Sequence, residues 1–246
     1  MEKYFFLTYF CAFLAHRNYN MGKNKIARFE ENKILPNVIQ PTRDEAISSF
    51  AHKGKWAAFF GNDNPIVLEL GCGKGEYSVG LAKAFPDKNF IGIDIKGARF
   101  WFGAKEAVQS GLNNVAFVRT QIELIDHLFA EGEVSEIWIT FPDPQIKYRR
   151  TKHRLTNPEF LGKYRKIMKK DGIIHLKTDS EFLHGYTLGV LQGFGHKILT
   201  SHHDIYGAEE YQPDTPLLKD IRTYYEDLFS SKGKTITYIK FQLKNE

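Results

Sequence analysis

The chain has 246 residues, of which 42% are hydrophobic and 26% are charged. This length and composition suit one α/β domain with short appendages and argue against an integral membrane protein. The formal net charge of +5 agrees with a polyanionic partner without establishing one. The two cysteines, Cys11 and Cys72, lack metal-ligand spacing. We therefore predict no disulfide framework and no zinc site, and a reducing cytoplasm fits.

The apolar start of the chain leaves two possibilities open. The segment 4–15 is aromatic and aliphatic, but it is too short to span a bilayer, and no small-residue cleavage site follows it. Met21 opens a second, polar start, so residues 1–20 are either part of the protein or an upstream extension that is not translated. Residues 21–64 predict an N-terminal arm with one helix near 44–60, and residues 65–246 predict the main domain.

Apolar runs typical of strands alternate with amphipathic stretches of helical length along the main domain. The predicted strands are Ile66–Leu70, Phe90–Asp94, Val115–Arg119, Glu136–Thr140, Ile173–Lys177, Lys197–Thr200 and a last, alternating run, Thr235–Leu243. This order indicates an α/β fold with helices on both faces of the sheet. We predict a doubly wound, mostly parallel sheet of seven strands whose last strand is antiparallel.

A glycine-rich turn follows the first predicted strand and precedes a helix that begins near Glu76. Glycines let the backbone turn sharply and approach a ligand closely. An acid lies just before the turn, and a second acid ends the next strand, where it can accept hydrogen bonds from ribose hydroxyls. The turn is therefore interpreted as a site for an adenosine-type cofactor, although a glycine turn without a ligand remains the alternative. The candidate residues are Glu69, Gly71, Gly73, Gly75 and Asp94.

The acidic surroundings of this turn favour S-adenosylmethionine over a nicotinamide dinucleotide. The dinucleotide fingerprint is G-x-G-x-x-G with a pyrophosphate at the helix N-terminus. Here the third glycine comes one residue early, and Glu76 occupies the place of glycine, where its carboxylate would oppose a phosphate. A cofactor with a positive sulfonium and no phosphate meets no such objection. We interpret Cys72 as a small residue that fills the turn rather than as a nucleophile.

The loop after the fourth predicted strand is a candidate substrate site, because ligands of open α/β sheets bind beyond the carboxyl ends of the strands. Asp143 stands between Pro142 and Pro144, which stiffen its presentation. The following segment, 147–154, holds five Lys or Arg, a tyrosine and a histidine, which suits phosphate contacts and stacking. The wider segment 141–170 holds ten Lys or Arg against two acids. A solvated basic surface is the alternative interpretation.

This loop resembles the Pro-Asp-Pro-Trp-Pro-Lys-Lys-Arg-His signature of the bacterial tRNA (guanine-N7)-methyltransferases. Three other segments resemble that family: 21–31 (MGKNKIARFEE), 176–179 (LKTD) and 223–229 (TYYEDLF). The chain departs from the pattern in five places. Gln145-Ile146 replaces Trp-Pro, Tyr148 replaces lysine, Arg150 replaces histidine, Asp94 replaces glutamate, and Gln121 replaces Asp or Asn.

The resemblance implies a Rossmann-like class I methyltransferase that transfers a methyl group from S-adenosylmethionine to N7 of guanine 46 in the variable loop of tRNA. It implies a cytoplasmic enzyme, monomeric or homodimeric, with no membrane or metal partner. In this family pattern Asp143 is catalytic and contacts the cofactor, and Gln121 contacts the adenine edge. The implied substrate-binding residues are Lys147, Arg149, Arg150, Lys152, Arg154, Asp179, Thr223 and Glu226.

Several alternatives stay open at this stage. Asp179 could instead cap the helix predicted over 181–194, and Thr223 with Glu226 could belong to an exposed polar helix face. The whole chain could be an RNA-binding protein with a non-catalytic nucleotide-binding fold. A nicotinamide oxidoreductase is disfavoured by the glycine spacing and by Glu76.

Overall fold

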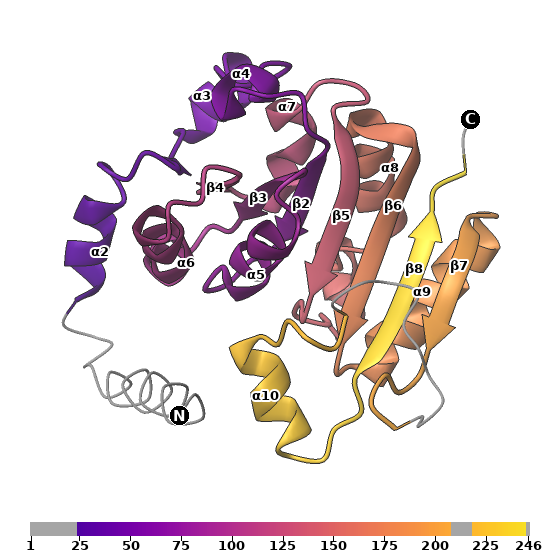
Figure 1. Ribbon diagram of the computed structural model, residues 1–246. Helices are drawn as coiled ribbons and strands as arrows, with labels where there is room; N and C mark the ends of the chain where they lie inside the picture. Colours follow the sequence, from indigo (N-terminus) through magenta and orange to yellow (C-terminus); the bar gives the residue numbers. More distant parts are fainter. Residues whose placement is uncertain (1–23, 208–217, 245–246) are drawn as a thin grey trace.

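Figure 1 shows the computed structural model, which describes residues 24–207 and 218–244. Within these residues eight strands form one sheet in the order β1-β4-β3-β2-β5-β6-β8-β7. Neighbouring strands are parallel except at β8, which is antiparallel to both β6 and β7. The expected extension 1–20 lies outside the described residues, so its status stays a prediction.

The elements follow one another in the alternation that the sequence predicts. The strands are β1 (Val38–Ile39), β2 (Ile66–Leu70), β3 (Asn89–Ile93), β4 (Val115–Val118), β5 (Val134–Thr140), β6 (Met168–Thr178), β7 (Lys197–His202) and β8 (Thr237–Gln242). The α-helices are α2 (Lys25–Glu31), α3 (Arg43–Ser48), α4 (Trp56–Phe60), α5 (Glu76–Ala84), α6 (Gly97–Gln109), α7 (Ile125–Leu128), α8 (Pro158–Ile167), α9 (Glu181–Gly193) and α10 (Tyr224–Ser230). Two short 3₁₀ helices are η2 (Ile122–Leu124) and η3 (Tyr148–His153).

Helices cover both faces of the sheet and create two apolar cores (Figure 1). α5 and α6 pack on β3 and β4 on one face, whereas α8 and α9 pack on β6 on the other. All five residues of β2 are buried: Leu68 and Leu70 face the core beneath α8, and Val67 faces the core beneath α5. Burial on both faces explains why the central parallel strands are continuous apolar runs.

The doubly wound, mostly parallel sheet with an antiparallel last strand is confirmed, but it has one strand more than predicted. The extra strand, β1, comes from the N-terminal arm and pairs with β4 at the edge of the sheet. A strand of two residues carries no periodicity that a sequence pattern could reveal. β6 also begins earlier than predicted, because the exposed residues 169–171 hide its first half from a search for apolar runs.

The single helix predicted near 44–60 is wrong, because the arm forms α3 and α4 with a turn between them. α3 starts at a capping box, in which the Glu45 N–H donates to Thr42 Oγ1 and the Thr42 N–H donates to the Glu45 carboxylate. The chain then leaves the helix, and Gly54 adopts a left-handed φ of 69° before α4 begins. The Gly54 N–H donates to the Glu133 carboxylate, which fixes this turn to the main domain.

The ring of Phe117 is enclosed by three glycines that bring the glycine turn, β3 and α6 together. A Cβ added to Gly75, Gly92 or Gly103 would lie 2.6, 2.9 or 3.1 Å from a carbon of that ring. Gly75 also has a φ of 80°, which side chains rarely adopt. Glycine is therefore required at Gly75 for two reasons, its backbone conformation and its contact with Phe117.

We expect Gly75→Ala to lower the free energy of unfolding by about 2–5 kcal/mol, because it combines left-handed strain with an overpacked contact. Gly111→Ala is the matched control, since Gly111 has a φ of 67° and nothing within 4 Å of an added Cβ. That control should lose only the backbone contribution, about 1–2 kcal/mol. Urea unfolding of both variants measures the difference, and equal losses would contradict the role of Phe117.

Candidate active site

The glycine turn projects from the carboxyl ends of β2 and β3. Gly71, Gly73 and Gly75 all have left-handed φ values, of 76°, 58° and 80°. The N–H groups of Gly71 and Cys72 donate to the Ile93 carbonyl at 2.8 and 3.1 Å, so the turn is bonded to β3. A Cβ built on Gly71 meets nothing within 4 Å, which leaves that side of the turn open to a ligand.

Asp94, which follows β3, holds the glycine turn in place. Its Oδ2 accepts from the Gly73 N–H at 3.0 Å, and its Oδ1 accepts from the Lys96 N–H at 2.8 Å. The side chain is partly exposed, so each oxygen retains accepting capacity on its open side. The structure thus brings Asp94 to the glycine turn, as the sequence spacing predicts.

Glu69 is buried in β2 and is bonded to two neighbouring elements. Its Oε2 accepts from the N–H and the hydroxyl of Ser78 in α5, at 2.9 and 2.5 Å, and its Oε1 accepts from the Thr140 hydroxyl at 2.7 Å. Burial raises the pKa of Glu69 to about 7, and the hydrogen bonds from Ser78 and Thr140 oppose that rise. A direct contact with a cofactor stays a prediction, whereas a positioning role is evident from these bonds.

Gln121 lies beyond the end of β4 and is exposed. Its side-chain oxygen accepts from the guanidinium of Arg43, at the start of α3. Sequence reasoning did not identify Arg43, because the two residues are distant in the chain and no local pattern links them.

The Pro-Asp-Pro loop leaves β5 through a strained turn. Phe141 and Gln145, on either side of Asp143, both adopt a φ of 48°, which is uncommon for residues other than glycine. The Gln145 N–H donates to Asp143 Oδ1 at 3.0 Å, and the Phe141 N–H donates to the Lys177 carbonyl. Asp143 is exposed, and its second oxygen has no hydrogen-bond partner among the described residues. The loop therefore presents a carboxylate to solvent at the carboxyl ends of the parallel strands, where the glycine turn also lies.

Arg154 contradicts the prediction that it tracks the RNA backbone. The residue is only 5% exposed, and its guanidinium donates to the carbonyls of Gln145 and Ile146 at 3.1–3.2 Å. It also lies over the rings of Phe182 and Tyr186 in α9. Its donors are directed at loop carbonyls instead of solvent, so Arg154 holds the Pro-Asp-Pro loop against the domain.

The other four cations of the loop are exposed on or beside η3: Lys147, Arg149, Arg150 and Lys152. The wider basic segment does not form one surface. Lys163 and Lys166 pair with Asp126 at 3.2 Å. Lys169 and Lys170 lie near the start of β6, at the end of the strand opposite to the Pro-Asp-Pro loop. The exposed positive charge that follows β5 therefore comes mainly from residues 147–152.

Asp179 directly follows β6, at the carboxyl end of the strand. The structure excludes the alternative that Asp179 caps α9. The cap is Ser180, whose hydroxyl accepts from the Leu183 N–H. Asp179 forms an ion pair with Lys234 at 2.6 Å. Asp179 therefore lies at the carboxyl end of β6, but its carboxylate is already paired with a cation of this chain.

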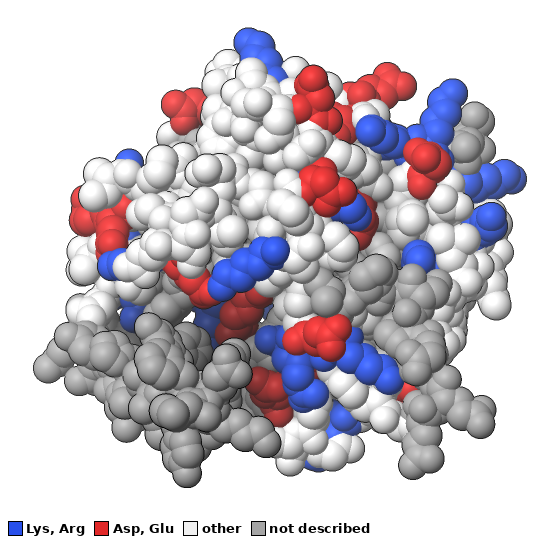
Figure 2. Space-filling view, viewed as in Figure 1, with Lys and Arg blue, Asp and Glu red and all other residues white. Residues whose placement is uncertain are grey.

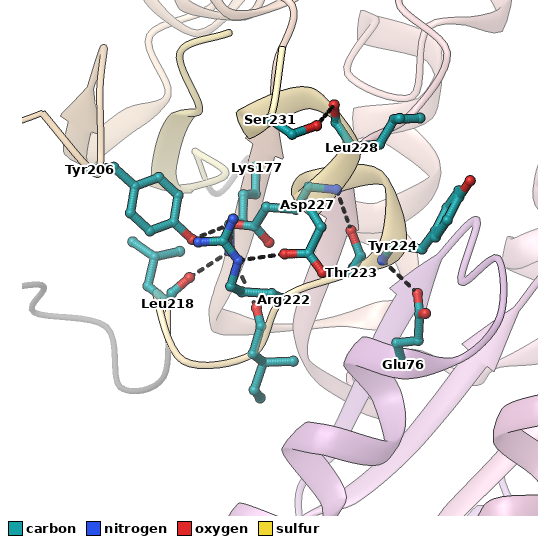
Figure 3. A network of polar contacts seen from close by, with 12 residues as sticks. Glu76, Lys177, Tyr206, Leu218, Arg222, Thr223, Tyr224, Asp227, Leu228 and Ser231 are labelled. Atoms are coloured by element: carbon teal, nitrogen blue, oxygen red, sulfur yellow. Dashed lines mark hydrogen bonds and ion pairs between the residues drawn. The ribbon is translucent and has the colours of Figure 1, made fainter. Parts of the chain in front are cut away.

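Thr223 and Glu226 do not form an exposed polar face and do not present their side chains to a substrate. Thr223 is the N-cap of α10, and its hydroxyl accepts from the Glu226 N–H. Glu226 is fully buried, where Lys177 pairs with it at 2.7 Å and the Tyr206 hydroxyl donates to it at 2.5 Å. The side chains of Lys177 and Tyr206 converge in Figure 3. Both predicted substrate contacts are therefore corrected to structural roles, because the charge of Glu226 is neutralised inside the protein.

Lys177 is the residue of this network that sequence reasoning missed. It is completely buried, and its ammonium also donates to the Leu218 carbonyl at 2.6 Å. Burial lowers the pKa of Lys177, and the charge of Glu226 opposes that shift. The sequence did contain a signal for this residue: a lysine within an apolar strand that is buried on both faces needs a buried partner for its charge.

α10 is also docked against the glycine turn. The Tyr224 N–H donates to Glu76 Oε2 at 3.0 Å (Figure 3). The Lys74 ammonium lies 4.1 Å from the Tyr224 ring centroid. Glu76 therefore supports α10 in addition to adding negative charge near the turn. Cys72 is buried, and burial raises the pKa of its thiol, so it fills the turn without acting as a nucleophile.

Figure 2 shows a hollow at this edge, between α5 and α10, in which acidic side chains are visible. The glycine turn adds an open backbone, and Asp94 adds a partly exposed carboxylate. This set of groups fits a cofactor that carries hydroxyls and positive charge.

Within the described residues, no helix is both long enough and apolar enough to cross a membrane. The same part of the chain holds no group of three or more His, Cys, Asp or Glu arranged to bind a metal ion.

The sheet order, the glycine turn and the Pro-Asp-Pro loop define a Rossmann-like methyltransferase. A family model described as "Putative methyltransferase" matches residues 63–239. The tRNA (guanine-N(7)-)-methyltransferase of Christiangramia forsetii is 65% identical over 91% of this chain and 99% of its own length. That of Bacteroides fragilis is 51% identical over 92% of this chain and 88% of its own. The chain belongs to the tRNA (guanine-N7)-methyltransferase family.

Solved structures with low sequence identity share the fold. The 16S rRNA methyltransferase KamB is similar with a TM-score of 0.59 and 12% identity, over 81% of this chain and 95% of that one. A 16S rRNA (adenine(1408)-N(1))-methyltransferase from Catenulisporales acidiphilia, solved with its cosubstrate SAM, gives 0.56 and 16%, over 78% and 91%.

We expect Glu69 to make stability depend on pH. Because burial raises its pKa from 4.5 to about 7, the folded state binds this proton more tightly than the unfolded state does. The resulting stabilisation is complete below pH 4.5 and is lost as pH rises through about 7, a change of about 3 kcal/mol. Glu69→Gln should lack this decline in urea unfolding measured from about pH 5 to about pH 8. An identical pH slope in variant and wild type would contradict the raised pKa.

Proposed function

We propose that this chain transfers a methyl group from S-adenosylmethionine to N7 of a guanine in tRNA, with guanine 46 of the variable loop as the target. The observation that carries the proposal is that the acidic glycine turn and the exposed Asp143 follow β2 and β5, which are neighbouring parallel strands. Membership of the family supports the reaction and the substrate. The domain that performs it is 65–246, close to the 63–239 of the family match.

The cofactor-binding residues that we propose are Gly71, Gly73, Gly75, Asp94 and Gln121, with Asp143 facing the reacting end. When bound, S-adenosylmethionine supplies an electrophilic methyl group. Asp94 accepts from ribose hydroxyls, and the carboxylates around the turn favour positive charge over phosphate. Glu69 acts by holding the turn and the substrate loop, since its oxygens already accept three hydrogen bonds.

Asp143 is the proposed catalytic residue. N7 of guanine has a free lone pair, so no general base is needed at that atom, and alignment of the reactants is the main requirement. The purine becomes cationic on methylation, and a carboxylate beside the base stabilises the developing charge. It also accepts from the donors of the Watson–Crick edge. The strained turn holds that carboxylate in one place before the substrate arrives.

The substrate surface consists of Lys147, Arg149, Arg150 and Lys152, with Asp179 nearby. These cations neutralise phosphates of the tRNA backbone. We further propose that the enzyme works in the cytoplasm, as a monomer or homodimer.

Methyl transfer from labelled cofactor to unmodified tRNA, followed by identification of the base and its position, tests the proposal. Label in 7-methylguanosine at position 46 is the expected result, and label in another base or position would overturn it. The rival, an RNA-binding protein without catalysis, predicts no binding of S-adenosylmethionine by calorimetry.

We expect Asp143→Asn to lower turnover by roughly 10²-fold or more, because it keeps the shape of the side chain but removes the stabilising charge. The affinity for tRNA should survive. Gln121→Ala should instead raise the cofactor concentration needed for half-maximal rate. Near wild-type turnover by Asp143→Asn at saturating substrates would identify the residue as a structural acid of the turn.

We expect the double variant Arg149→Gln with Lys152→Gln to bind tRNA more weakly and with a shallower salt dependence. The log–log slope should fall by up to roughly one unit for each phosphate that the variant no longer neutralises. The matched control is Lys169→Gln with Lys170→Gln, which removes the same charge from the opposite edge of the sheet. Equal effects in the two double variants would mean that only net charge matters.

A further inference from the structure

Tyr148 is the most exposed large hydrophobic residue described in the structure. It is 93% exposed, and the neighbouring Ile146 is 66% exposed. No ring contact or side-chain hydrogen bond involves the Tyr148 ring within residues 24–207 and 218–244. A single exposed aromatic residue is unremarkable by itself, so the support and the surroundings of this ring decide whether it has a role.

The backbone beneath this ring is firmly held. The Tyr148 carbonyl accepts from the Thr151 hydroxyl at 2.7 Å, and the Thr151 carbonyl accepts from the Asn157 amide at 3.1 Å. Arg154 bonds the carbonyls of Gln145 and Ile146. η3 therefore presents the ring to solvent on a preorganised support, which reduces the ordering cost of binding.

The ring is surrounded by positive charge. Its neighbours in the chain are Lys147 and Arg149, and Arg150 and Lys152 follow on the same 3₁₀ helix, all exposed. A phosphate backbone neutralises such cations, and an aromatic ring among them offers a surface on which a base can stack. A protein partner would have to supply acidic groups for all four cations, so RNA is the better match.

The position of the ring relative to Asp143 also suits RNA. Tyr148 comes five positions after Asp143, which limits the chain between them to about 18 Å. N7 lies on the major-groove edge of guanine, and a guanine in a loop exposes this edge to side chains when it leaves its stack. Its neighbours then lose a stacking partner, and one of their faces becomes available.

We propose that Tyr148 is a stacking platform for a tRNA base next to the methylated guanine, an inference that rests on the proposed function. The family signature has Trp-Pro where this chain has Gln145-Ile146, and lysine where it has Tyr148. This chain therefore carries its loop aromatic three residues later, on η3. The ring sets which unstacked conformation of the tRNA is held while Asp143 acts.

The test measures the affinity of unmodified tRNA, by anisotropy of a labelled transcript, from about 50 to about 200 mM salt. Tyr148→Ala should weaken binding between about 5-fold and 100-fold, as expected for one stacked base. Because no charge is removed, its salt slope should equal that of wild type. Tyr148→Phe should bind within about 2-fold of wild type, since it keeps the stacking face.

Phe194→Ala is the matched control, because Phe194 is 57% exposed and lies at the C-terminal end of α9, at the opposite edge of the sheet. It should bind tRNA as wild type does. The stacking role is overturned if Tyr148→Ala keeps wild-type affinity, which would point to a protein partner for the ring. A shallower salt slope in that variant, or an equal loss of affinity in Phe194→Ala, overturns it as well. Failure of the wild-type protein to bind or methylate tRNA would instead refute the proposed function itself.

Discussion

The carboxylate of Glu69 joins the three segments from which the site is built. It lies in β2, accepts from Ser78 in α5 and accepts from Thr140 at the end of β5. The glycine turn occupies the chain between Glu69 and Ser78, and the Pro-Asp-Pro loop begins directly after Thr140. One buried group therefore links the turn to the loop, in addition to the backbone pairing of β2 with β5.

Two buried cations complete this arrangement from remote parts of the chain. Arg154 fixes the Pro-Asp-Pro loop through its carbonyls, and Lys177 fixes α10 through its ion pair with Glu226. Buried cations are costly to leave without partners, so each of these contacts holds its segment in place. The charged side chains at the carboxyl ends of the strands are thus of two kinds: buried groups that hold loops and helices in place, and exposed groups that can contact a ligand.

This division suits a reaction that requires alignment more than proton transfer. A nucleophile with a free lone pair needs its partner held in line, and small displacements of the supporting loops reduce the rate. The strain at Phe141 and Gln145 persists because Asp143, Arg154 and the last pairing of β5 with β6 over-determine the turn. The rigid loop holds the Asp143 carboxylate in place, and the exposed side chains of η3 remain accessible beside it.

The sequence by itself determined the elements whose signals are local. Continuous apolar runs predicted the buried parallel strands, and the glycine spacing with Asp94 predicted the glycine turn between β2 and α5, because neighbouring residues encode both. Only the tertiary structure decided that Arg154 and Glu226 are buried, since their partners, Gln145 and Lys177, meet them through loop and sheet packing. The same holds for β1, a strand too short to show a period. A charged side chain looks the same in sequence whether it meets water or a buried partner, and only packing distinguishes the two.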